Sequence, residues 1–321
     1  MTTYSHILQA YQRIEGQAIR TPLLESTAIN QRLGGRVLFK VEALQRTGSF
    51  KFRGAYNKIS QLAQQGIKGV VAYSSGNHAQ GVALVAALFD MHAVIIMPAD
   101  SPAIKINNTR ALGGEVVLYD RYTQSREELG AALAQERNLA LVKPYDDPDI
   151  IAGQGTVGLE AAQQLQILGL TPGQMIAPCG GGGLISGCSI AIHQSFPDTH
   201  IWLAEPEHYD DAARSLQAKR RLANNTSHTS ICDAIVTPTT GELTFPIIEQ
   251  HVRGGVSVSE SYVLDAMAVC MQELKVVIEP GGSVGLAALL AGLLPCQDKT
   301  TLVILSGGNA DPQVLARALS Q

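Results

Sequence analysis

The sequence has few of the features that mark nucleic-acid-binding, disulfide-rich or membrane-spanning proteins. Its 24 Lys and Arg residues face 28 Asp and Glu residues, so the net charge is −4 and no basic excess is available for phosphate backbones. The five cysteines are odd in number and form no CxxC pair, which indicates buried free thiols. The longest apolar stretches, such as 284–295, are too short to cross a bilayer.

A signal for export is missing as well. The N-terminal segment MTTYSHILQAYQRIEG has no basic segment followed by an apolar one, so we expect no signal peptide and a reducing, cytoplasmic location. Aromatic residues make up only 5% of the chain, whereas 31 residues are glycine, which is typical of α/β enzymes with many tight turns. The composition therefore predicts a soluble enzyme that acts on a small molecule, with no nucleic-acid or membrane partner.

Apolar runs rich in β-forming residues alternate with helical patterns along almost the whole chain. Several of these runs show no polar alternation, which is typical of strands covered on both faces. The order predicts an α/β fold with doubly wound parallel sheets and with sites at the carboxyl ends of strands. The predicted strands are 37–41, 69–73, 93–97, 115–119, 140–143, 174–178, 200–204 and 301–305. The predicted helices include 54–65, 80–88, 125–136, 156–168, 189–196 and 283–294.

The loop that follows strand 174–178 is the richest in glycine. It reads CGGGGLISG over residues 179–187 and leads into a predicted helix. Consecutive glycines let backbone N–H groups converge on an anion, and the helix N-terminus adds a positive dipole end. The loop matches neither the dinucleotide fingerprint nor the P-loop, so we expect a phosphate on another kind of ligand. The alternative is a tight turn that packs helix on strand.

A second loop, TGSFKFRGA over residues 47–55, places Lys51 between two aromatic side chains at the start of a helix. Burial and a helix N-terminus both lower the pKa of a lysine, as an amine that forms a Schiff base requires. From this loop alone, a lysine whose stem lies on the surface is the simpler interpretation.

Two further loops, SSGNHAQ over residues 74–80 and SGGN over residues 306–309, also follow predicted strands. The first brings hydroxyl, amide and backbone donors to a helix N-terminus, which suits a substrate carboxylate. Its His78, taken alone, is a capping or core residue rather than a catalyst. In the second loop, the hydroxyl of Ser306 can hydrogen-bond a ring nitrogen without giving it a proton.

In this order, SFKFRGA, SSGNHAQG, GGGGL and SGGN resemble the motifs of the fold-type II pyridoxal-phosphate enzymes, specifically the serine/threonine dehydratase and serine racemase family. The resemblance runs from about residue 21 to residue 311. It implies a fold like that of tryptophan synthase β, with a large cofactor domain of residues 1–51 and 145–321. A smaller domain of residues 52–144 is inserted, and a homodimer is implied as well.

The resemblance also implies roles for individual residues. Lys51 forms the Schiff base with pyridoxal 5′-phosphate and removes the Cα proton of the substrate. Phe50 packs near the cofactor ring, Asn77 meets its 3′-oxygen, and Ser306 meets its pyridine nitrogen. The residues implied to hold the cofactor phosphate are Gly180, Gly181, Gly182, Gly183 and Leu184.

Ser75 and Arg126 bear on the choice of reaction and substrate. In racemases of the family, a serine at the position of Ser75 works on the face opposite the lysine; dehydratases carry the same serine, so both activities stay open. Arg126 matches a position that reaches the substrate carboxylate or side chain in racemase-like members. The alternative is a solvated arginine on a helix surface. The residues expected to bind the amino-acid substrate are Ser74, Ser75, Asn77, His78 and Arg126.

The acidic segment EPEHYDD, residues 205–211, predicts a cation site. In the racemase-like branch, a carboxylate, a backbone carbonyl four residues on and a carboxylate six residues on hold a divalent cation. Here these are Glu205, Tyr209 and Asp211, and such hard oxygen ligands suit Mg²⁺ or Ca²⁺. The alternative is an acidic turn that caps a helix at Asp211.

The predicted function is that of a pyridoxal-phosphate-dependent ammonia-lyase that converts a β-hydroxy amino acid, by default L-threonine or L-serine, to a 2-oxo acid and ammonia. The alternatives are a serine racemase or a 3-hydroxyaspartate dehydratase, which cation dependence and acceptance of a second carboxylate near Arg126 would favour. One departure also concerns the substrate, because Cys232-Asp233-Ala234 stands where the family usually has Ala-Asp-Gly. A β-replacement synthase is less favoured because it needs a substrate with an activated hydroxyl. A carrier protein is less favoured because it would need no Cα base, whereas Lys51, Ser75 and Ser306 are all present.

Overall fold

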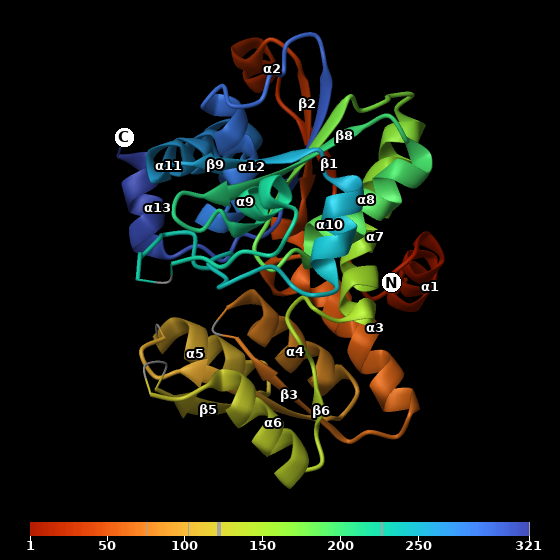
Figure 1. Ribbon diagram of the computed structural model, residues 1–321, viewed down its shortest axis with the longest axis vertical. Helices are drawn as coiled ribbons and strands as arrows, with labels where there is room; N and C mark the ends of the chain where they lie inside the picture. The colour runs from red at the N-terminus through yellow and green to blue at the C-terminus, as the bar shows by residue number, and fades with distance from the viewer. Residues whose placement is uncertain (75, 102, 121–122, 226, 321) are drawn as a thin grey trace.

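Two sheets with helices on both faces form the framework of the protein (Figure 1). The computed structural model describes residues 1–74, 76–101, 103–120, 123–225 and 227–320. One sheet has six strands in the order β1-β2-β10-β7-β8-β9 and the other has four in the order β5-β4-β3-β6. All neighbouring strands are parallel except the edge pair β1 and β2, which confirms the predicted fold class.

The strands are β1 (Leu23–Glu25), β2 (Arg36–Val41), β3 (Gly69–Tyr73), β4 (His92–Pro98), β5 (Glu115–Tyr119), β6 (Ala140–Leu141), β7 (Gln174–Pro178), β8 (His200–Pro206), β9 (Gly254–Val258) and β10 (Thr300–Leu305). The helices of the first half are α1 (Tyr4–Ile14), α2 (Thr27–Leu33), η1 (Glu42–Leu44), η2 (Arg46–Gly48), α3 (Lys51–Gln64), α4 (Asn77–Leu88), α5 (Ala103–Ala111), α6 (Arg126–Glu136) and α7 (Pro148–Ile167). Those of the second half are α8 (Gly183–Ser195), α9 (Asp211–Ala218), α10 (Thr244–His251), α11 (Glu260–Val269), η3 (Cys270–Leu274), α12 (Pro280–Leu290) and α13 (Pro312–Leu319).

The central strands are apolar without alternation because both of their faces are covered. In β3, the side chains of Val70 and Ala72 pack in the cluster that includes Phe52 of α3, whereas Val71 packs on the opposite side with Leu133 of α6. The four-stranded sheet and its helices occupy the lower part of Figure 1, and the six-stranded sheet the upper part. The smaller sheet lies inside segment 52–144, while the exact domain division stays a prediction.

Two strands were not expected from the sequence, namely the short edge strand β1 and the glycine-rich β9. A Cβ on Gly255 of β9 would lie 2.5 Å from the Leu203 side chain and 2.7 Å from Cβ of Ala213 in α9. Close packing of α9 on this strand therefore requires glycine, a residue that disfavours a strand when only local sequence is considered.

Several helices begin earlier than the sequence predicts. The starts of α3, α4 and α8 consist of residues from the motifs, and α12 starts with Pro-Gly-Gly. Glycine or polar residues at these starts conceal the helical period. These first turns carry backbone N–H groups without partners inside the helix, so the early starts place hydrogen-bond donors at the loops that carry the motifs. Within the described ranges, no helix is long and apolar enough to span a membrane, and all five cysteines are buried and free.

Candidate active site

The four motif loops meet at one cavity of about 320 Å³. Its wall includes Lys51 of α3, Asn77 of α4, the glycine loop before α8, and Ser306 after β10. Asn77 follows a strand of the smaller sheet, whereas the glycine loop and Ser306 follow strands of the larger one. The cavity therefore forms where the carboxyl ends of the two sets of strands approach each other. The structure thus brings together the residues that the motifs predicted for a single ligand; Ser75, the other predicted catalytic residue, lies outside the described residues.

Lys51 is the first residue of α3 and is half-buried. Its Nζ donates a hydrogen bond to the backbone oxygen of Pro144 at 2.8 Å and lies 5.2 Å from the centre of the Phe50 ring. Burial lowers the pKa of Lys51 to about 8, against the opposing effect of the Glu279 carboxylate. A substantial fraction of the amine is therefore neutral near pH 8, as nucleophilic attack on a carbonyl requires.

The glycine loop forms a tight turn into α8 and presents backbone to the cavity. Gly182 has φ +91°, and a Cβ on Gly181 would lie 2.2 Å from the ring of Tyr145. The helix begins at Gly183, so the N–H groups of Gly183 and Leu184 have no partner inside the helix and lie at the cavity wall. The loop is thus a turn that packs helix on strand, and its backbone N–H groups are also suited to a phosphate.

Asn77 lies in the first turn of α4, and hydrogen bonds fix its amide on both sides. Its Nδ2 donates to Oε1 of Glu279 at 2.6 Å, and its Oδ1 accepts from Nδ2 of Asn309 at 2.7 Å. Burial, together with the nearby Asp233 carboxylate, raises the pKa of Glu279 to about 7. The sequence analysis missed Glu279, although an acid directly before Pro-Gly-Gly at a predicted helix start was a signal to consider.

Ser306 closes the other side of the cavity at the end of β10. Its side chain is only slightly exposed, and its backbone oxygen accepts a hydrogen bond from the N–H of Phe50 at 3.1 Å. This contact ties the loop after β10 to the residue that precedes Lys51. The SGGN and SFKFRGA motifs are therefore held together by their backbones.

His78 follows Asn77 and is buried at the cavity wall. Its Nε2 lies 3.0 Å from the backbone oxygen of Val142, and its Nδ1 has no hydrogen-bond partner among the described residues. Burial, with a contribution from Lys51, lowers the pKa of His78 to about 3, so the ring is neutral at physiological pH. Ser74 also lines the cavity, and its Oγ accepts from the N–H of Gly76 at 3.2 Å.

The wall of the cavity formed by α5 and α6 carries two cations, each paired with a carboxylate. Arg126, the first residue of α6, lies with its guanidinium 5.3 Å from the centre of the Tyr73 ring. Its Nε donates to Glu127 at 2.8 Å. Lys105 of α5, which the sequence analysis missed, also lines the cavity and pairs with Asp233. Two cations thus face the same space as Lys51.

The carboxylates of the predicted cation site are close together and already accept hydrogen bonds from other groups of the protein. Glu205, at the end of β8, accepts hydrogen bonds from the N–H groups of Ala212 and Ala213 in α9. The carboxylate of Asp211 accepts from Nδ2 of Asn224 at 2.6 Å and from the N–H of Thr240 at 2.7 Å. Glu205 therefore caps α9, a role that the sequence analysis had considered for Asp211.

The electrostatics of this pair are those of two buried acids. Burial raises the pKa of Asp211 to about 6 and that of Glu205 well above its ordinary value, and the Asp211 charge adds to the second effect. The third predicted ligand, Tyr209, is buried, and its hydroxyl donates to the backbone oxygen of His228 at 2.6 Å. In the part of the chain that the structure describes, no three His, Cys, Asp or Glu side chains are grouped to hold a metal. A cation here would depend on two carboxylates and on carbonyl or water oxygens.

Comparisons with known proteins agree with this geometry. A family model described as "Pyridoxal-phosphate dependent enzyme" matches residues 14–307. An L-threo-3-hydroxyaspartate ammonia-lyase of Pseudomonas sp is 41% identical over 320 residues and covers 99% of either chain. The crystal structure of T.th. threonine deaminase has a TM-score of 0.90 and 44% identity, and the match covers 96% of this chain and 99% of that one. The structure of maize serine racemase has a TM-score of 0.92 and 36% identity, with 99% and 97% coverage.

Proposed function

The chain belongs to the pyridoxal-phosphate-dependent enzyme family as an ammonia-lyase of fold type II, and we propose that its substrate is L-threo-3-hydroxyaspartate. The observation that carries the proposal is Arg126, whose guanidinium lies on the wall of the cavity that Lys51 also lines. A guanidinium binds a carboxylate through two parallel hydrogen bonds. L-threonine and L-serine, the default substrates predicted from the sequence, have no second carboxylate to occupy this position. The name of the Pseudomonas relative supports the same choice.

The residues present fit the cofactor. The backbone cradle of the glycine loop would hold the phosphate, Asn77 the 3′-oxygen and Ser306 the pyridine nitrogen. Phe50 would pack near the ring, and Lys51 would form the covalent link. When bound, pyridoxal phosphate supplies an electron sink that stabilises the negative charge left at Cα.

In the proposed reaction, the side chains bind and orient the substrate and move one proton. Once the substrate amine has taken the place of Lys51 in the covalent link, the freed Nζ removes the Cα proton, and its lowered pKa suits a general base that works near neutral pH. Ser74 and the first turn of α4 hold the α-carboxylate, while Arg126 holds the distal one. Loss of the Cα proton with the β-hydroxyl releases water, and hydrolysis then gives a 2-oxo diacid and ammonia.

The assay that tests this proposal compares substrates in the holoenzyme. Release of 2-oxo acid and ammonia is measured with L-threo-3-hydroxyaspartate, L-threonine, L-serine and D-serine, and chiral inversion of serine is followed in parallel. We expect the highest kcat/KM for the hydroxyaspartate. Arg126→Met should lower that value about tenfold more than the value for L-serine, because only the dicarboxylate loses a charged hydrogen bond.

Arg137→Met is the matched control, since Arg137 follows α6, pairs with Glu115 and does not line the cavity. It should leave the ratio between the substrates unchanged. A preference for threonine, or equal losses for both substrates in Arg126→Met, would refute the proposed substrate. Fast inversion of serine would instead support the racemase alternative.

Three other predictions belong to this proposal. The first is a divalent cation, Mg²⁺ or Ca²⁺, held by Glu205, the carbonyl of Tyr209 and Asp211. Both carboxylates are buried, and neither forms an ion pair with a lysine or arginine among the described residues. The second is a homodimer, and the third is a cytoplasmic location. Cation titration of the purified protein tests the first prediction, and gel filtration tests the second.

A further inference from the structure

Glu279 is a buried acid at the cavity wall that no motif pointed to. It precedes α12 at the N-cap position, and its side chain is almost completely enclosed. Its Oε1 lies 2.6 Å from Nδ2 of Asn77, although 202 positions separate the two residues in the sequence. The contact therefore joins the start of α4 to the start of α12 across the cavity.

The other end of the Asn77 amide is fixed as well. Oδ1 of Asn77 accepts a hydrogen bond from Nδ2 of Asn309, which also donates to the backbone oxygen of Thr47 at 2.7 Å. An amide group has one carbonyl oxygen and two N–H donors. With the oxygen held by Asn309 and one N–H held by Glu279, a rotation of the amide would lose both contacts. One N–H of Asn77 is then left to face a ligand.

The backbone around Glu279 is shaped to admit its carboxylate. A Cβ on Gly307 would lie 2.0 Å from Oε1 of Glu279 and 3.2 Å from Nδ2 of Asn77. The N–H of Glu279 donates to the backbone oxygen of the same glycine at 3.0 Å. The first glycine of the SGGN motif is therefore required by the contact between Glu279 and Asn77.

We propose that Glu279 is a positioning residue for the cofactor, because by accepting one N–H of Asn77 it turns the other N–H toward the 3′-oxygen of pyridoxal phosphate. The inference rests on the proposed contact of Asn77 with that oxygen and is independent of the substrate. An ionised carboxylate accepts a stronger hydrogen bond than a neutral acid does. The orientation of Asn77 is therefore held most firmly at a pH where Glu279 is ionised.

The charges that face Glu279 set where this ionisation occurs. Burial and the carboxylate of Asp233 raise its pKa to about 7, while Asn77, Lys105 and Lys51 act in the opposite direction. Because the value lies near neutrality, the hydrogen bond to Asn77 changes in strength within the range where the holoenzyme can be studied. The visible absorption of bound pyridoxal phosphate should report this change, since the 3′-oxygen is part of its conjugated system.

The test measures cofactor affinity and the pH titration of the visible absorption band in Glu279→Gln, Glu279→Ala and Gly307→Ala. Glu279→Gln keeps an acceptor for Asn77, so it should bind pyridoxal phosphate nearly as well as the wild type but lose the titration near pH 7. Glu279→Ala removes the acceptor and should weaken binding about tenfold. Gly307→Ala leaves every charge in place and should have the same effect as Glu279→Ala, because its Cβ displaces the carboxylate.

Glu160→Gln is the matched control, since Glu160 is a buried acid outside the cavity. It should lower thermal stability without moving the absorption band or its titration. The proposal is overturned if Glu279→Ala and Glu160→Gln show the same cofactor affinity and the same titration of the absorption band. It is also overturned if the titration near pH 7 persists in Glu279→Gln. Should Glu279→Ala not fold, Asn309→Ala frees the opposite end of the Asn77 amide, and an unchanged cofactor affinity in that variant would refute the positioning role. A wrong substrate assignment would leave all of these readouts unaffected.

Discussion

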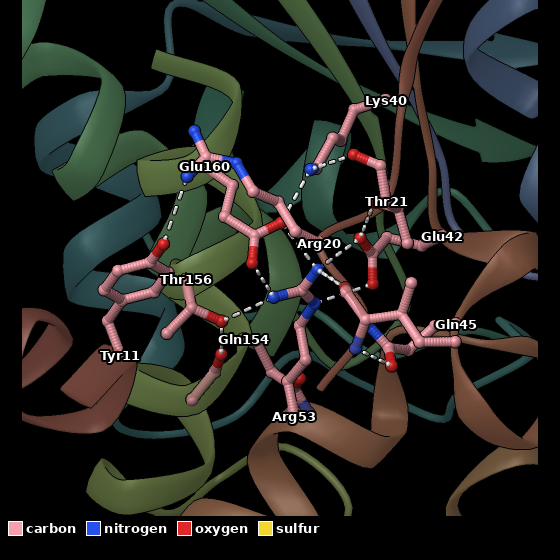
Figure 2. A network of polar contacts seen from close by, with 12 residues as sticks. Tyr11, Arg20, Thr21, Lys40, Glu42, Gln45, Arg53, Gln154, Thr156 and Glu160 are labelled. Carbon is pink, nitrogen blue, oxygen red and sulfur yellow. Dashed lines mark hydrogen bonds and ion pairs between the residues drawn. The ribbon is translucent and has the colours of Figure 1, made fainter. Parts of the chain in front are cut away.

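Two cations in the first turn of α3 differ in their partners and in the extent of their burial. The guanidinium of Arg53 is completely buried and pairs with two carboxylates, Glu42 at 2.8 Å and Glu160 at 2.8 Å (Figure 2). Nζ of Lys51, two residues earlier, donates to the backbone oxygen of Pro144. No carboxylate among the described residues forms an ion pair with it.

Burial and ion-pair partners together set the pKa values of these cations. The two carboxylates raise the pKa of Arg53 despite its desolvation, whereas the pKa of Lys51 falls to about 8. Lys40 is an intermediate case, because it pairs with Glu160, which Arg53 also uses, and burial still lowers its pKa. Lys51 differs from both in that it lines the cavity and has no ion pair among the described residues, which suits its amine to act as a base.

Removal of Lys51 tests the reactive side of this comparison and should have the largest effect. Lys51→Ala removes the only side-chain amine proposed to link the cofactor and to accept the Cα proton, so turnover should fall below detection. The visible absorption of the covalent link should disappear, while the glycine loop still binds the cofactor phosphate. Activity assays and absorption spectra check this, and turnover close to that of the wild type would show that another residue is the base.

Removal of Arg53 tests the structural side. Arg53→Met leaves Glu42 and Glu160 buried without their main partner, so the free energy of unfolding should fall by about 3–5 kcal/mol. Arg32→Met is the control, because the ion pair of Arg32 with Asp265 is exposed and should contribute less than about 1 kcal/mol. Urea denaturation measures both variants. Similar losses in the two would mean that the buried network adds no more than a surface pair does.

The pH dependence of cofactor rebinding sharpens the same contrast. Lys51 is protonated below its pKa of about 8 and neutral above it, and only the neutral amine attacks the carbonyl of pyridoxal phosphate. The rate at which the cofactor-free enzyme recovers its visible absorption should therefore rise about tenfold per pH unit below pH 8 and level off above it. Stopped-flow absorbance measures the rate. A rise that continues to pH 10 would indicate a lysine with its ordinary pKa.

Much of the framework could be predicted from the sequence because its strongest signals are local. Several strands of both sheets are continuous apolar runs, and β3 and β7 have the predicted bounds. Helix starts were placed late because glycine and polar residues in the motifs obscure the helical period. β9 was missed because Gly255 is there for its contact with α9, which a local pattern does not reveal.

The site could be predicted only as far as residues are grouped along the chain. The glycine loop, Lys51 and Asn77 belong to short motifs, and the structure places them around one cavity. Glu279 and Lys105 have no such motif, and their importance comes from partners far away in the sequence, Asn77 and Asp233. Paired side chains of this kind become visible only when the fold brings the segments together.

Glu205 and Asp211 are the acidic counterpart of Lys51, because burial shifts their pKa values toward the neutral form as well. Cation binding tests whether a positive charge reverses this effect. Their raised pKa values mean that the folded protein holds protons more tightly than the unfolded chain does, so without a cation its stability falls as pH rises through about 6. At pH 8 both acids are driven toward ionisation, and Mg²⁺ should raise the melting temperature by about 3 °C. At pH 5 protons compete with the cation, and the shift should nearly vanish. Thermal denaturation with Mg²⁺ or with EDTA at the two pH values measures this, and Asp211→Asn, which removes one charge, should abolish the difference. An equal shift at both pH values, or an undiminished one in Asp211→Asn, would place the cation elsewhere and would leave Glu205 as a cap for α9 and Asp211 as the acceptor for Asn224 and Thr240.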